Sequence, residues 1–90
     1  MAKAHVDPDE LRRFARDLNR FNLELTALVQ GLNARLRGLE QTWQDQEQKK
    51  FSEEFTQATK VLSRFLDISQ QHVAALTRKA SFIDEYLRQR

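Results

Sequence analysis

The stretch Leu39-Glu-Gln-Thr-Trp-Gln-Asp-Gln-Glu-Gln48 separates two long helical patterns and contains the only tryptophan, Trp43. We interpret it as the turn of a helical hairpin, over about residues 41–45, with Trp43 as its apolar anchor. Asp45 and Gln48 have the spacing of a capping box, in which an N-cap side chain and a side chain three residues later bond to backbone N–H groups. A second helix is therefore expected over about residues 46–89.

The sequence before this turn predicts a first helix over about residues 8–40. Asp7 can accept hydrogen bonds from free backbone N–H groups as the N-cap, and Pro8 fits the first helical position. Glu10 can complete a capping box with Asp7. The chain has one proline and two glycines, and this scarcity favours long uninterrupted helices over a sheet with many turns.

Leucine recurs every seventh residue through the first helix, and a second apolar row accompanies it. Heptad spacing of this kind is typical of helices that pack side by side along their length. The first row is Leu11, Leu18, Leu25, Leu32 and Leu39, and the second is Phe14, Phe21 and Leu28.

The second helix also carries two neighbouring rows of apolar residues. Two adjacent rows form a band that is wider than a single stripe. We expect one row to pack against the first helix within the hairpin. The other row, with Leu66, Val73 and Leu87, would then face water. The row expected within the hairpin is Phe55, Leu62, Leu76 and Ile83.

An isolated pair of helices has little core, and long exposed apolar rows usually mark an interface. The predicted fold is therefore all-α, an antiparallel helical hairpin of two long helices that forms one domain over residues 1–90. We expect this hairpin to dimerise into a four-helix bundle. The sequence leaves open a homodimer or a heterodimer with a related hairpin protein. The predicted core and dimer interface comprises Leu18, Leu25, Leu32, Phe55, Leu62, Leu66, Val73 and Leu76.

The composition argues against several other classes of function. The chain has no cysteine and only two histidines, and its net charge of +2 is spread along the sequence. We expect no catalytic residues, metal site or cofactor, since no nucleophile–base constellation or phosphate loop is present. The chain lacks a signal-peptide pattern and an apolar run of about 20 residues, so we expect synthesis in the cytoplasm and no stable membrane insertion. Any export would then use a signal-peptide-independent route.

A hairpin of this length with a lone tryptophan at its turn resembles the WXG family of small helical proteins associated with type VII (ESX) secretion. The resemblance rests on Trp43, on Phe51 eight residues later, and on the opening Val6-Asp-Pro-Asp-Glu-Leu11. It implies a non-enzymatic association module that acts as a small partner, adaptor or co-secreted subunit. The family motif Trp-X-Gly reads Trp43-Gln44-Asp45 here, and Asp45 can replace glycine as an N-cap or in a turn.

The resemblance also implies a secretion signal in which an acidic residue follows a tyrosine by four positions. Tyr86 is the only tyrosine, and Arg90 stands four residues later. Export would then require a partner that carries the signal. One alternative is a cytoplasmic structural or adaptor hairpin unrelated to secretion. Another is a module that binds nucleic acid or anionic membranes through basic residues of the first helix, Arg12, Arg13, Arg16 and Arg20. We favour no nucleic-acid partner, because acidic residues interrupt that cluster.

Overall fold

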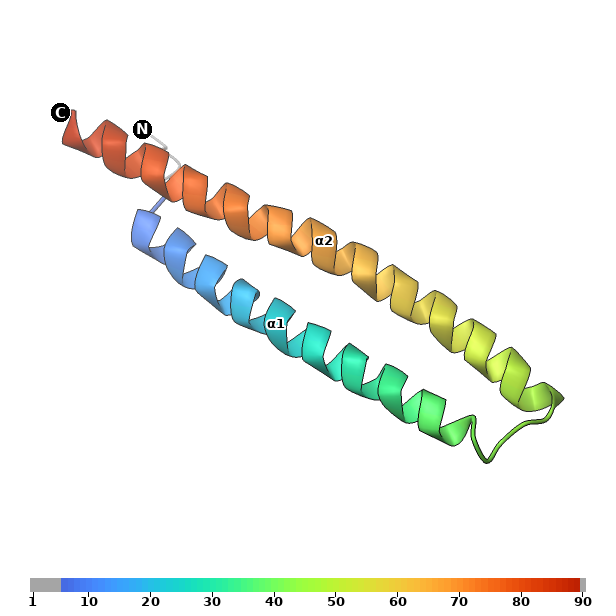
Figure 1. The fold of residues 1–90 in the computed structure, drawn as a ribbon. Coiled ribbons are helices and arrows are strands. Elements are labelled where there is room, and N and C mark those ends of the chain that lie inside the picture. Colours follow the sequence, from blue (N-terminus) through green and yellow to red (C-terminus); the bar gives the residue numbers. More distant parts are fainter. Residues whose placement is uncertain (1–5, 90) are drawn as a thin grey trace.

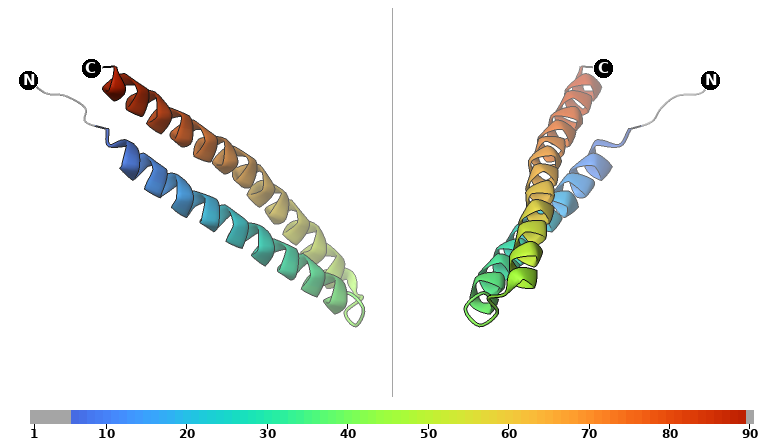
Figure 2. Two further views of the ribbon diagram at one scale, coloured as in Figure 1. Left: turned by 60° about the vertical axis from the view of Figure 1, so that its left-hand side comes forward. Right: turned by 90° about the vertical axis from the view of Figure 1, so that its right-hand side faces the viewer.

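The computed structural model describes residues 6–89, which form two antiparallel α-helices (Figure 1). Helix α1 spans Pro8–Leu39 and α2 spans Gln46–Arg88, close to the ranges 8–40 and 46–89 expected from the sequence. They form a rod of 68 × 22 × 15 Å, and Figure 2 shows the helices side by side in its left view and crossing each other in its right view. The predicted fold class, an all-α antiparallel hairpin, is confirmed.

The start of α1 is capped by one side chain. The Asp7 carboxylate accepts a hydrogen bond from the backbone N–H of Asp9 at 2.9 Å, and Pro8 occupies the first helical turn. The expected capping-box role of Glu10 is wrong, because its carboxylate instead lies 3.5 Å from the guanidinium of Arg13. The Asp7 side chain bonds two residues ahead instead of three, and the exposed Glu10 side chain gains an ion pair one turn along the helix.

The chain leaves α1 through a tightened last turn. The backbone N–H of Trp43 donates to the carbonyl of Leu39 at 2.9 Å, and that of Gln41 donates to the carbonyl of Gly38 at 3.2 Å. Between residues 6 and 89, no residue has a positive φ. Gly38 therefore lies before the turn without supplying the left-handed conformation that often ends a helix.

The hairpin interface is formed by two heptad columns on each helix. Its least exposed apolar side chains are Ala15, Leu66 and Ala80, at 4%, 9% and 0% exposure. The small residues allow close packing toward the open end of the hairpin. The interface comprises Leu11, Ala15, Leu18, Asn22, Leu25, Val29 and Leu36 from α1, and Phe55, Leu62, Leu66, Ser69, Val73, Leu76 and Ala80 from α2.

The expectation that Leu66 and Val73 face water in the single hairpin is wrong. Leu66 is buried and Val73 is half-buried, whereas Leu87 is 49% exposed as expected. The two apolar rows of α2 that the sequence suggested are neighbouring heptad columns, three and four residues apart. One partner helix covers two such columns, so both rows belong to the same interface.

Polar contacts tie the two arms of the hairpin together at the middle and at both ends. In the middle, the Ser69 hydroxyl donates to the Asn22 side-chain oxygen at 2.7 Å, and both residues are 2% exposed. Polar groups in a helical interface favour one register, because any shift leaves them unpaired. At the open end Arg12 pairs with Asp84, and near the turn the Ser52 hydroxyl donates to the Glu40 carboxylate at 2.6 Å.

Candidate association surface

One side of the hairpin carries a continuous set of exposed apolar side chains, which we call the apolar face. Phe21 of α1 and Phe65 of α2 meet there edge to face, with ring centroids 6.3 Å apart. Nearer the turn, Leu32, Leu39 and Phe51 line an apolar groove that crosses both helices. The face consists of Phe14, Phe21, Leu28, Leu32 and Leu39 from α1 and Phe51, Val61, Phe65, Ile68, Phe82 and Tyr86 from α2, all at least 41% exposed.

Helical geometry explains why these residues share one side. Phe21 immediately precedes the interface residue Asn22, and Phe65 immediately precedes Leu66. Successive residues of a helix are about 100° apart, so the exposed rows are rotated by about 100° from the hairpin interface. The contact between Phe21 and Phe65 shows that the two rotated rows face the same way.

The exposure of large apolar residues is concentrated on this face. Five of the six phenylalanines are exposed, and Phe55 is half-buried in the groove. Helical spacing places Leu23, which is 64% exposed, on the opposite side of α1. A protein chain rarely exposes a contiguous apolar surface of this kind to water unless the surface binds something.

The part of the apolar face on α2 was not predicted from the sequence. Val61, Ile68, Ala75 and Phe82 are each seven residues apart, which is the signal of a second heptad pattern. That pattern begins one residue before the rows that form the hairpin interface, so α2 offers two interfaces about 100° apart. In a four-helix bundle each helix contacts two neighbours in this way.

The residues predicted to form a core or dimer interface divide between the two surfaces. Leu32 is 49% exposed and lies on the apolar face. Phe55 lines the groove near the turn and also contacts the hairpin interface. The others lie within the hairpin interface. Leu66 is buried there, and the half-buried residues are Leu18, Leu25, Leu62, Val73 and Leu76.

At the turn, aromatic side chains extend the apolar face to the end of the molecule. The half-buried Trp43 ring lies 5.8 Å from Phe51, and Phe51 stacks on Phe55 at 5.9 Å. Trp43 thus reaches the apolar groove only through Phe51, which lines it. Contact by a partner over this face would cover the same aromatic cluster.

Asp45 occupies the glycine position of a Trp-X-Gly motif without backbone strain. It is the N-cap of α2, with φ −107° and ψ −174°, and its carboxylate accepts from the N–H of Gln48 at 2.9 Å. The expected reciprocal capping by the Gln48 side chain is wrong. Its amide instead donates to the Ser52 hydroxyl at 2.7 Å and to Glu40 at 3.4 Å, because it lies buried between the helices.

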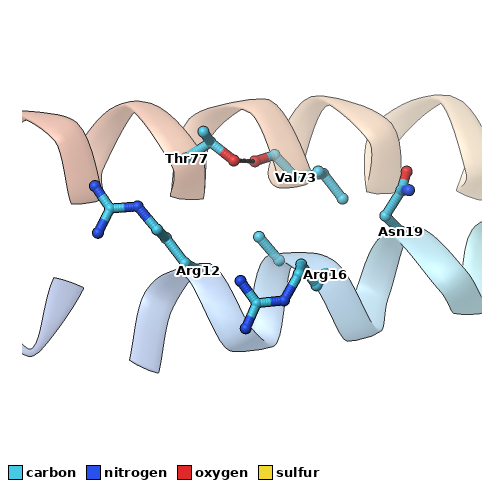
Figure 3. Close-up of a pocket in the computed structure, with 6 residues that line it drawn as sticks. Arg12, Arg16, Asn19, Val73 and Thr77 are labelled. Carbon is cyan, nitrogen blue, oxygen red and sulfur yellow. Dashed lines mark hydrogen bonds between the residues drawn. The ribbon is translucent and has the colours of Figure 1, made fainter. Parts of the chain in front are cut away.

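Two of the polar residues that line a shallow groove near the open end, Arg12 and Thr77, already have hydrogen-bond or ion-pair partners (Figure 3). The Thr77 hydroxyl donates to the carbonyl of Val73 at 2.9 Å. Arg12 pairs with Asp84 and lies 3.6 Å from Asp9. The groove therefore presents no hydroxyl activated by a neighbouring base.

The basic cluster of α1 is likewise partly neutralised, since Arg12 and Arg13 both have acidic partners. Within residues 6–89, no three His, Cys, Asp or Glu side chains are placed to hold a metal ion. In the same range, neither helix has a stretch apolar enough to cross a bilayer. The apolar face remains the dominant surface feature of the described chain.

Known structures of similar shape include the secreted protein EsxB of Bacillus anthracis strain Sterne. A selenomethionine-labelled crystal structure of it matches with a TM-score of 0.81 at 26% identity, over 96% of this chain and 98% of that chain. The wild-type structure in another crystal form matches with a TM-score of 0.77 at 27% identity, over 90% and 93%. No curated protein matches in sequence. The family described as "Proteins of 100 residues with WXG" matches residues 3–83, so the chain belongs to the WXG100 family.

Proposed function

We propose that the hairpin acts by association, packing its apolar face against a second hairpin to form a four-helix bundle. The observation that carries this proposal is the continuous row of exposed phenylalanine and leucine, which the two helices cannot cover themselves. The second heptad pattern of α2, about 100° from the first, fits the position of a helix in such a bundle. Burial of these side chains supplies the driving force for association.

We further propose that the assembled pair takes part in type VII (ESX) secretion, as an exported protein or as the partner of one. Membership of the WXG100 family and similarity to EsxB, which is a secreted protein, support this role. The chain would be made in the cytoplasm and leave without a cleaved signal peptide. It would act without catalysis or a cofactor, through the apolar face and the aromatic cluster around Trp43.

Two measurements test the two parts of this proposal. Light scattering after size exclusion, over a dilution series, should give a molar mass near twice 10.6 kDa. By immunoblot, the culture medium of a producing strain should contain the protein. The medium of a strain that lacks the secretion motor should not. A monomer at every concentration, both alone and with related hairpin proteins, would refute association. Absence from the medium together with a stable cytoplasmic dimer would refute export.

One observation favours a second candidate function. Arg90 stands at the position four residues after Tyr86 where the family's signal has an acidic residue. A cytoplasmic adaptor would have no use for that signal and would still use the apolar face. It predicts a stable dimer that stays in the cell and that the secretion motor does not affect. Co-export with a partner that carries the acidic signal would exclude it.

A further inference from the structure

We propose that the hairpin opens in two steps, and that the buried pair of Asn22 and Ser69 sets the boundary between them. The part beyond this pair separates first, as one unit, while the part next to the turn stays folded. We call these parts the open half, residues 8–21 and 70–88, and the turn half, residues 23–39 and 46–68. The inference is independent of the proposed association and export, because it concerns the opening of a single hairpin.

The first observation is a buried amide nitrogen that lacks a partner. The side-chain oxygen of Asn22 accepts a hydrogen bond from the Ser69 hydroxyl at 2.7 Å. Within residues 6–89, the Nδ2 atom of Asn22 is the one buried side-chain nitrogen or oxygen without a hydrogen-bond partner. A donor that is buried in this way loses its bonds to water without replacing them. The layer formed by Asn22 and Ser69 therefore weakens the interface at the middle of the rod.

The second observation is that the side chains packed on either side of this layer differ in size. Because the helices are antiparallel, steps back along α1 from Asn22 match equal steps forward along α2 from Ser69. The pairs toward the open end are Leu18 with Val73, Ala15 with Leu76, Leu11 with Ala80 and Pro8 with Ile83. The pairs toward the turn are Leu25 with Leu66, Val29 with Leu62, Leu32 with Thr59 and Leu36 with Phe55. Alanine occurs only toward the open end, and since small side chains bury less apolar area, packing stabilises the open half less.

The third observation is a groove in the open half that reaches the helix interface. It is lined by Ala15 and Val73, which both belong to that interface, and its volume of about 400 Å³ exceeds the 180 Å³ of the groove near the turn. Figure 3 shows it between the two helices, with Arg12 and Asn19 on one side and Val73 and Thr77 on the other. Side chains that border an unfilled space make fewer van der Waals contacts. The open half is therefore the less tightly packed part of the hairpin.

The two ends of the rod also differ in the contacts that hold them together. At the open end, the ion pair between Arg12 and Asp84 joins side chains that are 33% and 39% exposed, and pairs accessible to water stabilise a fold only slightly. At the turn end, the chain itself connects the helices, and Phe51 packs against both Trp43 and Phe55. Separation of the helices should therefore begin at the open end.

The length of the open half explains why it would open as a unit. Its segment of α1, residues 8–21, is close to the ~12–15 residues below which isolated helices are marginal in water. Separated from α2, this segment should lose its helix and expose its backbone amides. The same event would uncover interface side chains such as Val73 and Leu76, at the end of the rod where α1 begins and α2 ends (Figure 1). The aromatic cluster around Trp43 would stay intact.

Hydrogen exchange of the full chain, followed by mass spectrometry of its peptides, tests the inference. Amide protection in the open half should be at least about tenfold lower than in the turn half, with a step at the layer of Asn22 and Ser69. Both halves contribute to the apolar face, so association would raise protection in both and keep the contrast. Equal protection in the two halves would overturn the inference. Protection that falls gradually toward all four helix ends, including the two at the turn, would also overturn it, because that pattern is ordinary fraying.

A double variant tests the role of the polar layer. Asn22→Leu combined with Ser69→Ala replaces both partners by apolar side chains and removes the unpaired donor. Protection of the open half should then rise about tenfold, which corresponds to about 1.4 kcal/mol, and the step should disappear. The matched control, Asn33→Leu combined with Ser63→Ala, makes the same changes at half-buried and exposed positions of the turn half. It should leave the open half unchanged.

Circular dichroism establishes that each variant is helical before its exchange is measured. A helical Asn22→Leu/Ser69→Ala chain whose open half is no better protected than in wild type would overturn the role of that layer. Arg12→Ala provides a second test that leaves the interface residues in place. It removes the ion pair with Asp84 and should lower protection in the open half about two- to fivefold, with the turn half unchanged. An equal loss in both halves would show that the hairpin opens as a single unit and would overturn the inference.

Discussion

Two leucines of α1 allow a matched test of the apolar face. Leu28 lies on the apolar face and is 66% exposed, whereas Leu23 lies on the opposite side and is 64% exposed. Replacement of either by alanine keeps a strong helix former in place. The two variants remove the same atoms from the same helix at nearly the same exposure. Any difference between them therefore reports which side of the hairpin is covered by a partner.

The expected effect of Leu28→Ala follows from its exposed area. The change removes three carbon atoms, each worth about 0.8 kcal/mol when fully buried. Since 66% of the residue is exposed in the hairpin, about 1.6 kcal/mol per copy remains to be gained on association. A symmetric dimer contains the residue twice, so Leu28→Ala should weaken it by about 3 kcal/mol, or about two hundredfold in Kd.

The measurement is the dissociation constant from sedimentation equilibrium, with helix content followed by circular dichroism. Leu28→Ala should raise Kd with unchanged helix content, and Leu23→Ala should leave both unchanged. A rise of only about 15-fold would fit a partner that is a different chain, since the residue would then be covered once. Equal effects of the two variants would refute the assignment of the apolar face.

Substitutions at three further positions test the hairpin itself. Leu66→Asp should abolish helical structure and not merely separate dimers, because a buried unpaired carboxylate costs several kcal/mol. A variant whose circular dichroism spectrum stays helical would place Leu66 outside the hairpin interface. Ser69→Ala leaves the buried Asn22 oxygen without its donor and should lower the free energy of unfolding in urea by about 1–3 kcal/mol; an unchanged midpoint would contradict the importance of that bond. Asp45→Ala should cost about 1 kcal/mol and Asp45→Gly a few tenths, and identical thermal melts of all three chains would show that the cap contributes nothing.

The fold was predictable because several local signals in the sequence agree. The heptad leucines, the scarcity of glycine and proline, and the break around Trp43 all indicate two long helices joined by a short turn. Each signal depends only on residues that are near one another in the chain. Asp7 and Asp45 were likewise identifiable as N-caps, because a short acidic side chain before an amphipathic run has few other roles.

The assignment of each apolar row to a surface was harder to predict. Leu66 is buried, whereas Phe65, one residue earlier, is 44% exposed. Both residues are apolar and both fit a heptad, so composition does not distinguish them. The distinction depends on the rotation of α2 about its axis, which is set by contacts with α1 such as the bond between Ser69 and Asn22.

The partners of the capping side chains were only half predictable. The N-cap side chain has one set of donors within reach, but Glu10 and Gln48 had alternatives that depend on the rest of the structure. Glu10 pairs with Arg13, and the buried Gln48 amide bonds to Ser52 of α2 and to Glu40, the C-cap of α1. A three-residue spacing permits a capping box without requiring it. The side chain takes the partner that its burial and neighbours offer.

The Trp-Gln-Asp sequence has a physical consequence for the turn. Glycine at position 45 would leave the first N–H groups of α2 without a side-chain acceptor, whereas Asp45 supplies one at 2.9 Å. Because φ at this position is −107°, the backbone does not need glycine's access to positive φ. The part of the motif that the fold uses is therefore the tryptophan, which packs on Phe51, together with a residue that can begin a helix. The aspartate meets that second requirement through its side chain, and it fixes the start of α2 beside the aromatic cluster of the apolar face.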